Sequence, residues 1–230
     1  MSLRYAPVLA LFILTTAFTT VSASAQIITD GRMWATITLQ ERTGTSSPWR
    51  WSADVIFRSR DGVDALDTLT FRVTVGYDVT ARTSVWAGYV NSQTFPVAGG
   101  SVLEHRYFGQ HLWSGRSRGG GLSFRTRFEQ RDVENNSGPA WRVRHQIRYS
   151  HPFREGSRLY WVGADEILIH TNATTRYDRG FDQNRMSVGI GHPIGSSARV
   201  EAGYLNQFSH SVIGPNRLNH IVSVVINAGF

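Results

Sequence analysis

Hydrophobic and polar residues alternate along most of this chain, and few stretches show a helical period. In residues 122–131, apolar side chains such as Leu122 and Phe124 fall at every second position, with Arg125 and Arg127 between them. Because successive side chains of a strand point to opposite sides of a sheet, this pattern predicts strands with one apolar and one polar face. The same alternation recurs in residues 69–79, 141–150 and 218–230.

We count eleven such segments, and their expected starts lie near Met33, Trp49, Leu69, Thr83, Leu103, Gly121, Ala140, Arg158, Phe181, Arg199 and Leu218. Each runs for roughly 9–13 residues, about the length that a tilted strand needs to cross a bilayer. In a soluble β-sandwich the charged faces would simply meet solvent. So many amphipathic strands, without helices or a second apolar layer, instead favour a sheet closed on itself, which leaves no backbone edge unpaired.

The connections between these segments alternate in length. Short ones are expected at Thr43–Ser47, Ala81-Arg82, Gly115–Gly120, Phe153–Ser157 and Gly195–Ala198. Longer, more polar ones are expected at Asp61–Thr68, Thr94–Val102, Asp132–Pro139, Asn172–Gly180 and Ser209–Arg217. Short periplasmic turns and longer outer loops are typical of outer-membrane barrels. We therefore predict an all-β fold, a closed antiparallel transmembrane β-barrel.

The strand number remains open between ten and twelve. Bacterial single-chain barrels have even strand counts, and counting back from Phe230 makes the Met33–Glu41 segment run inward from the outside. A short strand at Gln26–Thr29, joined through an Asp30-Gly31 turn, would give twelve strands. Alternatively, the first segment is no wall strand and the barrel has ten, so the role of residues 26–42 is not fixed.

The N-terminus has the features of a cleaved signal peptide. Arg4 precedes the apolar run Ala6–Leu14, and Ala23 and Ala25 form a small-residue site before Gln26. The run is too short for a spanning helix, which needs about 20 apolar residues. We expect a signal peptide over residues 1–25, a single barrel domain over residues 26–230, and a location in the bacterial outer membrane.

Composition narrows the expected partners. The chain has no cysteine, all 24 of its basic residues are arginine, and its formal net charge is +7. Such a charge can indicate nucleic-acid binding, but an exported protein rarely meets nucleic acid. Outer-membrane lipid, lipopolysaccharide and anionic solutes are the expected partners, and no nucleic acid. We expect the protein to be a monomer.

The chain ends inside an apolar alternation instead of a polar tail. Its last nine residues resemble the terminal strand that the barrel-assembly machinery recognises in outer-membrane proteins. The residues that carry this resemblance are Val222, Val224, Ile226 and Phe230. It implies that periplasmic chaperones and the assembly machinery act on the chain during its biogenesis.

Four further segments extend the resemblance over nearly the whole chain after the signal peptide. They are Trp34–Leu39, Glu104–Phe108, Trp141–Tyr149 and Phe181–Ile190. Their order resembles a family of small Gram-negative outer-membrane barrels known only as a domain of unknown function. The resemblance implies a barrel and a location, and it supplies neither an activity nor catalytic residues.

The polar faces carry a surplus of arginine, for which two interpretations stay open. The arginines form a lumen-facing basic ladder at Arg72, Arg106, Arg125, Arg127, Arg142, Arg144 and Arg148. In the first interpretation they pair with carboxylates and fill a narrow lumen, as the bidentate guanidinium group favours. In the second they make a positive lumen that admits anions. The expected function is therefore structural, or a narrow passive channel for small, anionic solutes.

The alternative is a barrel enzyme, such as a lipid A-modifying acyl hydrolase or a protease. Ser209, His210 and Ser211 supply a nucleophile and a base, but neighbouring residues of a strand point to opposite faces. No constellation fixes catalytic roles, so we expect no enzyme activity, no catalytic residues and no cofactor. The eight histidines are scattered in pairs at most, and we expect no metal site.

Overall fold

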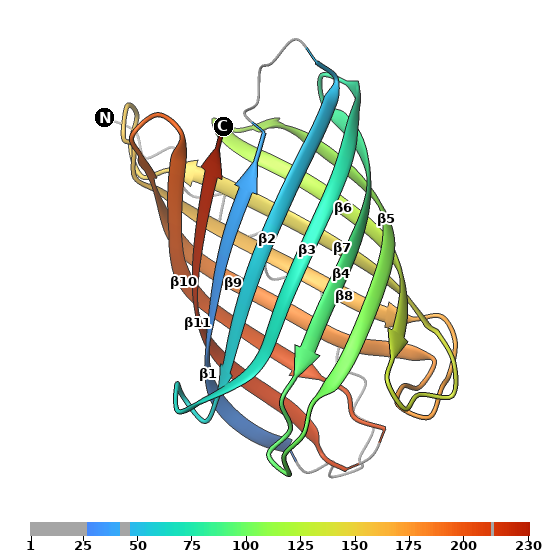
Figure 1. Cartoon of the computed structure of the whole chain (residues 1–230). Coiled ribbons are helices and arrows are strands. Elements are labelled where there is room, and N and C mark those ends of the chain that lie inside the picture. Colours follow the sequence, from blue (N-terminus) through green and yellow to red (C-terminus); the bar gives the residue numbers. More distant parts are fainter. Residues whose placement is uncertain (1–26, 42–46, 213) are drawn as a thin grey trace.

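The structure is a computed structural model that describes residues 27–41, 47–212 and 214–230. The predicted signal peptide lies outside the described residues, as does most of the predicted Thr43–Ser47 turn. Eleven strands form one closed barrel (Figure 1). They are β1 (Ile27–Gln40), β2 (Trp49–Arg60), β3 (Ala65–Thr80), β4 (Thr83–Thr94), β5 (Val102–Ser117), β6 (Gly120–Val133), β7 (Ala140–Pro152), β8 (Tyr160–His170), β9 (Gly180–Ile194), β10 (Ala198–Ser209) and β11 (Asn216–Gly229).

The predicted closed barrel is confirmed, and each strand pairs antiparallel with the next one along the chain. Strands β2, β4 and β7 begin at the residues that the alternation predicts, although β3 and β5 reach 16 residues each. The short connections lie together at the upper end of Figure 1, with the C-terminus, and the longer loops lie at the lower end. We call these the turn end and the loop end.

The strand number differs from both alternatives that the sequence left open. Strand β1 pairs in parallel with β11, from Ile27 opposite Asn216 to Gln40 opposite Gly229. The arrows of β1 and β11 accordingly point the same way in Figure 1. A barrel of purely antiparallel pairs closes only with an even count, and one parallel pair makes eleven possible.

The twelve-strand alternative is wrong in its Asp30-Gly31 turn, because both residues lie within the continuous strand β1. Gly31 is paired with His220 of β11, so its backbone follows the neighbouring strand. On the inner face, the Arg32 Nε donates to Asp30 Oδ2 at 2.7 Å, an i, i+2 contact that an extended strand allows. No separate strand therefore precedes β1 among the described residues.

The backbone conformation of two residues explains the short turn between β5 and β6. The predicted Gly115–Gly120 connection shrinks to Arg118 and Gly119, because β5 runs on to Ser117. Both residues have positive φ, 48° and 81°. Two consecutive residues in this region make a type I′ turn, whose twist matches that of the flanking strands.

Charged side chains are buried inside the barrel and apolar side chains are exposed on its outer face, which is the reverse of the usual distribution in a soluble protein. Buried residues include charged side chains such as Glu129, which is fully buried, and Arg142. The outward face carries exposed apolar residues on every strand, such as Val73, Val188 and Val222, each more than half exposed. No helix among the described residues is long and apolar enough to cross a membrane.

Aromatic side chains from neighbouring strands pack in pairs on the outer surface. These pairs are Trp49–Tyr77, Trp113–Phe124, Phe128–Trp141 and Tyr149–Trp161. Two other aromatic residues, Trp34 and Tyr160, face the interior. Trp34 lines internal cavities, and the Tyr160 hydroxyl donates to Glu201. Their strands place them on the polar face, because β1 and β8 each present alternate residues inward.

Candidate functional site: an arginine-rich interior

The seven arginines of the predicted ladder all lie on the inner face of the barrel wall. Several of their ion pairs join strands that are not neighbours in the sheet, and such a contact must cross the interior. Arg148 of β7 reaches Glu201 of β10 at 2.6 Å, and Arg125 of β6 reaches Glu166 of β8 at 2.6 Å. Arg72 and Arg106 line a cavity inside the barrel, together with Arg127.

Two buried carboxylates organise the centre of this arrangement. Glu129 accepts from Arg142 at 2.7 Å and from Arg144 at 2.9 Å, and Arg127 lies 3.5 Å away. Arg144 also donates to Glu166 at 2.8 Å, so its guanidinium group bridges the two carboxylates. We call Glu129, Glu166, Arg125, Arg142 and Arg144 the central network. Charge-assisted, partly bidentate contacts of this kind hold planar guanidinium groups in fixed orientations.

Smaller groups of pairs lie around the central network. Asp54 accepts from Arg72 and from the Thr38 hydroxyl, at 2.7 and 2.6 Å. Glu104 accepts from Arg106 at 2.7 Å and from Arg131 at 2.5 Å. Every buried carboxylate of the interior thus has at least one arginine partner, as the first interpretation of the ladder requires.

The arginines nevertheless outnumber the carboxylates that they face. The arginines that line the mid-barrel cavity or form the ion pairs described above, and their carboxylate partners, number ten and six: Arg58, Arg72, Arg106, Arg125, Arg127, Arg131, Arg142, Arg144, Arg148 and Arg185 against Asp54, Glu104, Glu129, Glu166, Asp182 and Glu201. Four positive charges therefore remain in surplus. The pairing leaves the interior positive even though each carboxylate is neutralised.

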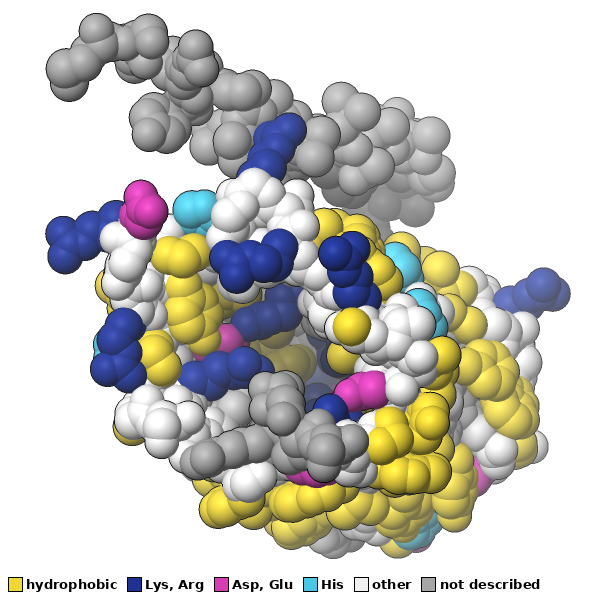
Figure 2. All heavy atoms as spheres, turned by 90° about the horizontal axis from the view of Figure 1, so that it is seen from above, with side chains coloured by type: hydrophobic (Ala, Val, Ile, Leu, Met, Phe, Trp, Pro, Cys, Tyr) yellow, Lys and Arg dark blue, Asp and Glu magenta, His cyan; other side chains and the backbone are white. Residues whose placement is uncertain are grey.

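Two neighbouring cavities lie inside the barrel. A mid-barrel cavity of about 270 Å³ is lined by seven arginines and a single carboxylate, Glu166. A loop-end cavity of about 380 Å³ is lined by eight arginines with Asp67 and Glu104. Seen from the turn end, the barrel is hollow and basic side chains show inside the opening (Figure 2).

The two cavities meet at four residues that line both of them: Trp34, Arg58, Arg106 and Arg185. We call these four the junction residues. The guanidinium carbon of Arg58 lies 4.3 Å from the centre of the Trp34 ring, and that of Arg185 lies 5.4 Å from it. Trp34, Arg58 and Arg185 are not members of the ladder that the sequence predicts. Alternation alone places all three on inner faces, but only the closed barrel brings β1, β2 and β9 around one space.

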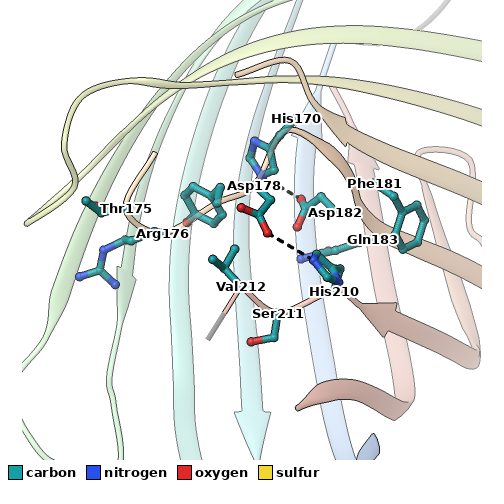
Figure 3. Close-up of a pocket in the computed structure, with 11 residues that line it drawn as sticks. His170, Thr175, Arg176, Asp178, Phe181, Asp182, Gln183, His210, Ser211 and Val212 are labelled. Atoms are coloured by element: carbon teal, nitrogen blue, oxygen red, sulfur yellow. Dashed lines mark ion pairs between the residues drawn. The ribbon is translucent and has the colours of Figure 1, made fainter. Parts of the chain in front are cut away.

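The serine and histidine residues of the enzyme alternative lie near a third pocket, of about 320 Å³, at the loop end (Figure 3). His210 Nε2 lies 3.6 Å from Asp178, and His170 Nε2 lies 3.4 Å from Asp182. The Ser211 hydroxyl points away from His210 in Figure 3, and Ser209 lines the loop-end cavity instead. The described residues contain no group of three histidines or acidic residues suited to hold a metal ion.

The residues of the expected assembly signal follow one face of the last strand. Val222, Ile226 and Phe230 are exposed on the outer surface, and Val224 lies between them on the same face. The Phe230 amide donates to the Gln40 carbonyl at 3.1 Å, which continues the β1–β11 pairing beyond β11. The terminal aromatic ring therefore sits at the seam where the barrel closes.

Comparison with known proteins gives a family without an assigned activity. An uncharacterised protein of Methylorubrum extorquens is 31% identical over 205 residues, which cover 88% of this chain and 89% of that protein. No solved structure matches the chain. A family model described as protein of unknown function, DUF2490, matches residues 31–219. These residues include strands β2 to β10, most of β1 and all the junction residues, and the chain belongs to this DUF2490 family.

Proposed function

We propose that this protein is a bacterial outer-membrane barrel that acts as a narrow passive channel for small anions. The observation that carries the proposal is the mid-barrel cavity, where seven arginines face one carboxylate. A ring of fixed positive charge around a narrow passage favours anions and repels cations. The surplus charge distinguishes this interior from one whose ion pairs only fill space.

The outer surface supports a membrane location. Its alternate residues are apolar on strand after strand, as lipid contact requires, and exposed patches of this extent are uncommon on soluble monomers. The closed sheet satisfies the backbone hydrogen bonds of every strand, which hydrocarbon demands. The expected signal peptide and the apolar terminal strand are in keeping with export and with insertion by the assembly machinery.

The interior supports a passage that is narrowed but not filled. The central network draws the arginines of β6 and β7 toward the carboxylates of β6 and β8. On the opposite side of the mid-barrel cavity, β1, β9 and β11 contribute the small or neutral residues Thr36, Ser187 and Val225, and Arg58 and Arg185 line the cavity beside them. The two interpretations of the arginine ladder are therefore combined: paired arginines pack one wall and leave a positively charged space beside it.

The test is to refold residues 26–230 in detergent and add the protein to a planar bilayer. The proposal predicts an unboiled gel band that shifts on boiling, together with discrete conductance steps. A band shift without steps would contradict a channel and leave a barrel with a structural role. Solubility of the native protein without detergent would contradict the membrane location itself.

Biogenesis gives a second test of the location. Replacing Phe230 by Ser removes the terminal aromatic residue from the closing seam while changing nothing in the lumen. We expect less protein in the outer-membrane fraction of cells and an unchanged conductance for the protein that is refolded in vitro. Equal amounts of both variants in the membrane would contradict a role for Phe230 in assembly.

A further inference from the structure

The junction residues contain hydrogen-bond donors that lack acceptors. The Trp34 Nε1, the Arg58 Nε and the Arg185 Nε are all buried and have no partner among the described residues. Buried polar atoms in proteins are almost always satisfied, and exceptions commonly mark a place where water or an ion belongs. Three such donors, from β1, β2 and β9, lie around one indole ring.

The positive charge of Arg58 is also not compensated by an ion pair among the described residues. Arg58 forms no ion pair with any residue that the structure describes, whereas Arg106 and Arg144 act on it as nearby like charges. The carboxylates Asp67 and Glu104 also act on Arg58, but neither forms an ion pair with it. Asp67 is already paired with Arg32, and Glu104 with Arg106 and Arg131.

Arg185 is only partly neutralised. Its one ion pair, with Glu166 at 3.6 Å, is longer than the contacts of 2.6 and 2.8 Å that Arg125 and Arg144 make with the same carboxylate. Its remaining hydrogen bond goes to the neutral Gln183, at 2.8 Å. Positive charge in a partly desolvated site is far more costly than in water, so an anion bound here would be strongly favoured.

We propose that Trp34, Arg58 and Arg185, beside Arg106, form a binding site for a small oxyanion such as sulfate, phosphate or a carboxylate. Guanidinium groups match the planar or tetrahedral oxygens of these ions, and the indole N–H adds a neutral donor. The adjoining cavities hold about 270 and 380 Å³, which is room for an anion with several waters at about 30 Å³ each. The site lies in the lumen that the barrel wall encloses, so it takes a diffusible ion and not a lipid head group.

Stacking prepares the site for this ion. The Trp34 ring holds the Arg58 guanidinium at 4.3 Å and Arg185 at 5.4 Å, so both cations are positioned before an anion arrives. Water could satisfy the free N–H groups, but it would leave the positive charge in place. The inference rests on the proposed function only in that the anion reaches the lumen from solution.

Calorimetric titration of the refolded barrel, in a neutral detergent at fixed ionic strength, tests the site. Sodium sulfate, sodium phosphate and sodium acetate are the probes, each against wild type and three variants. Arg58→Met removes the unpaired cation, and Trp34→Phe keeps the ring but removes its N–H. Arg127→Met is the matched control, because it removes the same charge from the same cavity at a residue that is hydrogen-bonded to Gln110.

We expect saturable binding of at least one oxyanion by wild type, with a stoichiometry of one. Arg58→Met should weaken binding by at least about tenfold and Trp34→Phe by about fivefold, as for the loss of a charged and a neutral hydrogen bond. Arg127→Met should change it by less than about threefold, as expected for a charge outside the site. The heat-induced gel shift checks that each variant is folded.

Two results would overturn the site. The first is no saturable heat for any of the three anions with the folded wild type, which would mean that only water occupies the junction. The second is equal weakening by Arg58→Met and Arg127→Met, which would mean general attraction to a positive lumen. Binding does not require passage, so a barrel that binds sulfate but never conducts keeps the site and loses the channel. A barrel that conducts but binds none of the three anions keeps the channel and loses the site.

Discussion

Arg142 and Arg144 on one side of the interior differ from Arg58 and Arg185 on the other in what surrounds their guanidinium groups. The first two donate to Glu129 at 2.7 and 2.9 Å, and each reaches a second carboxylate as well. The Arg58 guanidinium group lies over the Trp34 ring and forms no ion pair with a described residue, and Arg185 shares a carboxylate that two closer arginines already occupy. All four nevertheless lie on the inner faces of strands in one barrel.

This difference indicates that the paired arginines stabilise the wall, whereas the arginines without a close carboxylate are suited to bind an anion. A buried arginine with a well-placed carboxylate fixes the geometry of the wall, and removal of its partner is costly. A buried arginine without one lowers stability and remains available to an incoming anion. The comparison predicts that substitutions in the two groups change stability in opposite directions.

The largest effect is expected from Glu129→Gln. The change leaves Arg127, Arg142 and Arg144 facing a neutral amide inside the wall, and breaking a buried pair costs about 3–5 kcal/mol. Urea unfolding of the refolded barrel, followed by the gel shift, measures the loss. A variant as stable as wild type would show that the central network does not hold the wall, and the comparison would fail.

The second-largest effect is expected when a charged side chain is placed on the outer face of the barrel. Val73 is 55% exposed near the middle of β3, and Val97 is 82% exposed in the connection between β4 and β5. Arginine on the lipid face near the membrane midplane costs about 2–4 kcal/mol, falling to about 0–1 near the interfaces. We expect Val73→Arg to destabilise the barrel in lipid vesicles and Val97→Arg to have little effect. Equal tolerance at both positions would contradict a lipid-facing outer wall.

Arg58→Met is expected to act in the opposite direction to Glu129→Gln. Removal of an unpaired cation and an unsatisfied N–H should raise the free energy of unfolding by about 1–3 kcal/mol in oxyanion-free buffer. Arg127→Met, which breaks a contact to Glu129, should not stabilise. If Arg58→Met destabilises the barrel as much as Glu129→Gln does, then the two groups of arginines do not differ as proposed.

The smallest effect is expected where a pair is partly open to solvent. Glu201 accepts from Arg148, whose side chain is 35% exposed, and from Tyr160. Exposed pairs contribute about 0–1 kcal/mol because water screens them. Glu201→Gln should therefore shift the urea midpoint only slightly. A loss comparable to that of Glu129→Gln would mean that burial does not set the ranking.

Local alternation was sufficient to predict the strands, the turn at Ala81-Arg82 and the inward faces of the seven ladder arginines. It could not predict how the barrel closes, because the parallel pairing of β1 with β11 depends on contacts between residues about as far apart as the chain allows. For the same reason the sequence did not predict that the junction residues lie together. Trp34 shares a face with Thr36 and Thr38, but nothing local indicates that Arg58 and Arg185 close over its ring. Pairing across a lumen is a property of the closed barrel.

The reversal potential of the wild-type channel shows whether the positive interior passes anions, as we propose. The measurement uses one refolded barrel in a planar bilayer with potassium chloride at different concentrations on its two sides. We expect a reversal potential displaced toward the equilibrium potential of chloride. A displacement toward that of potassium, or no current at all from a folded and inserted barrel, would contradict it.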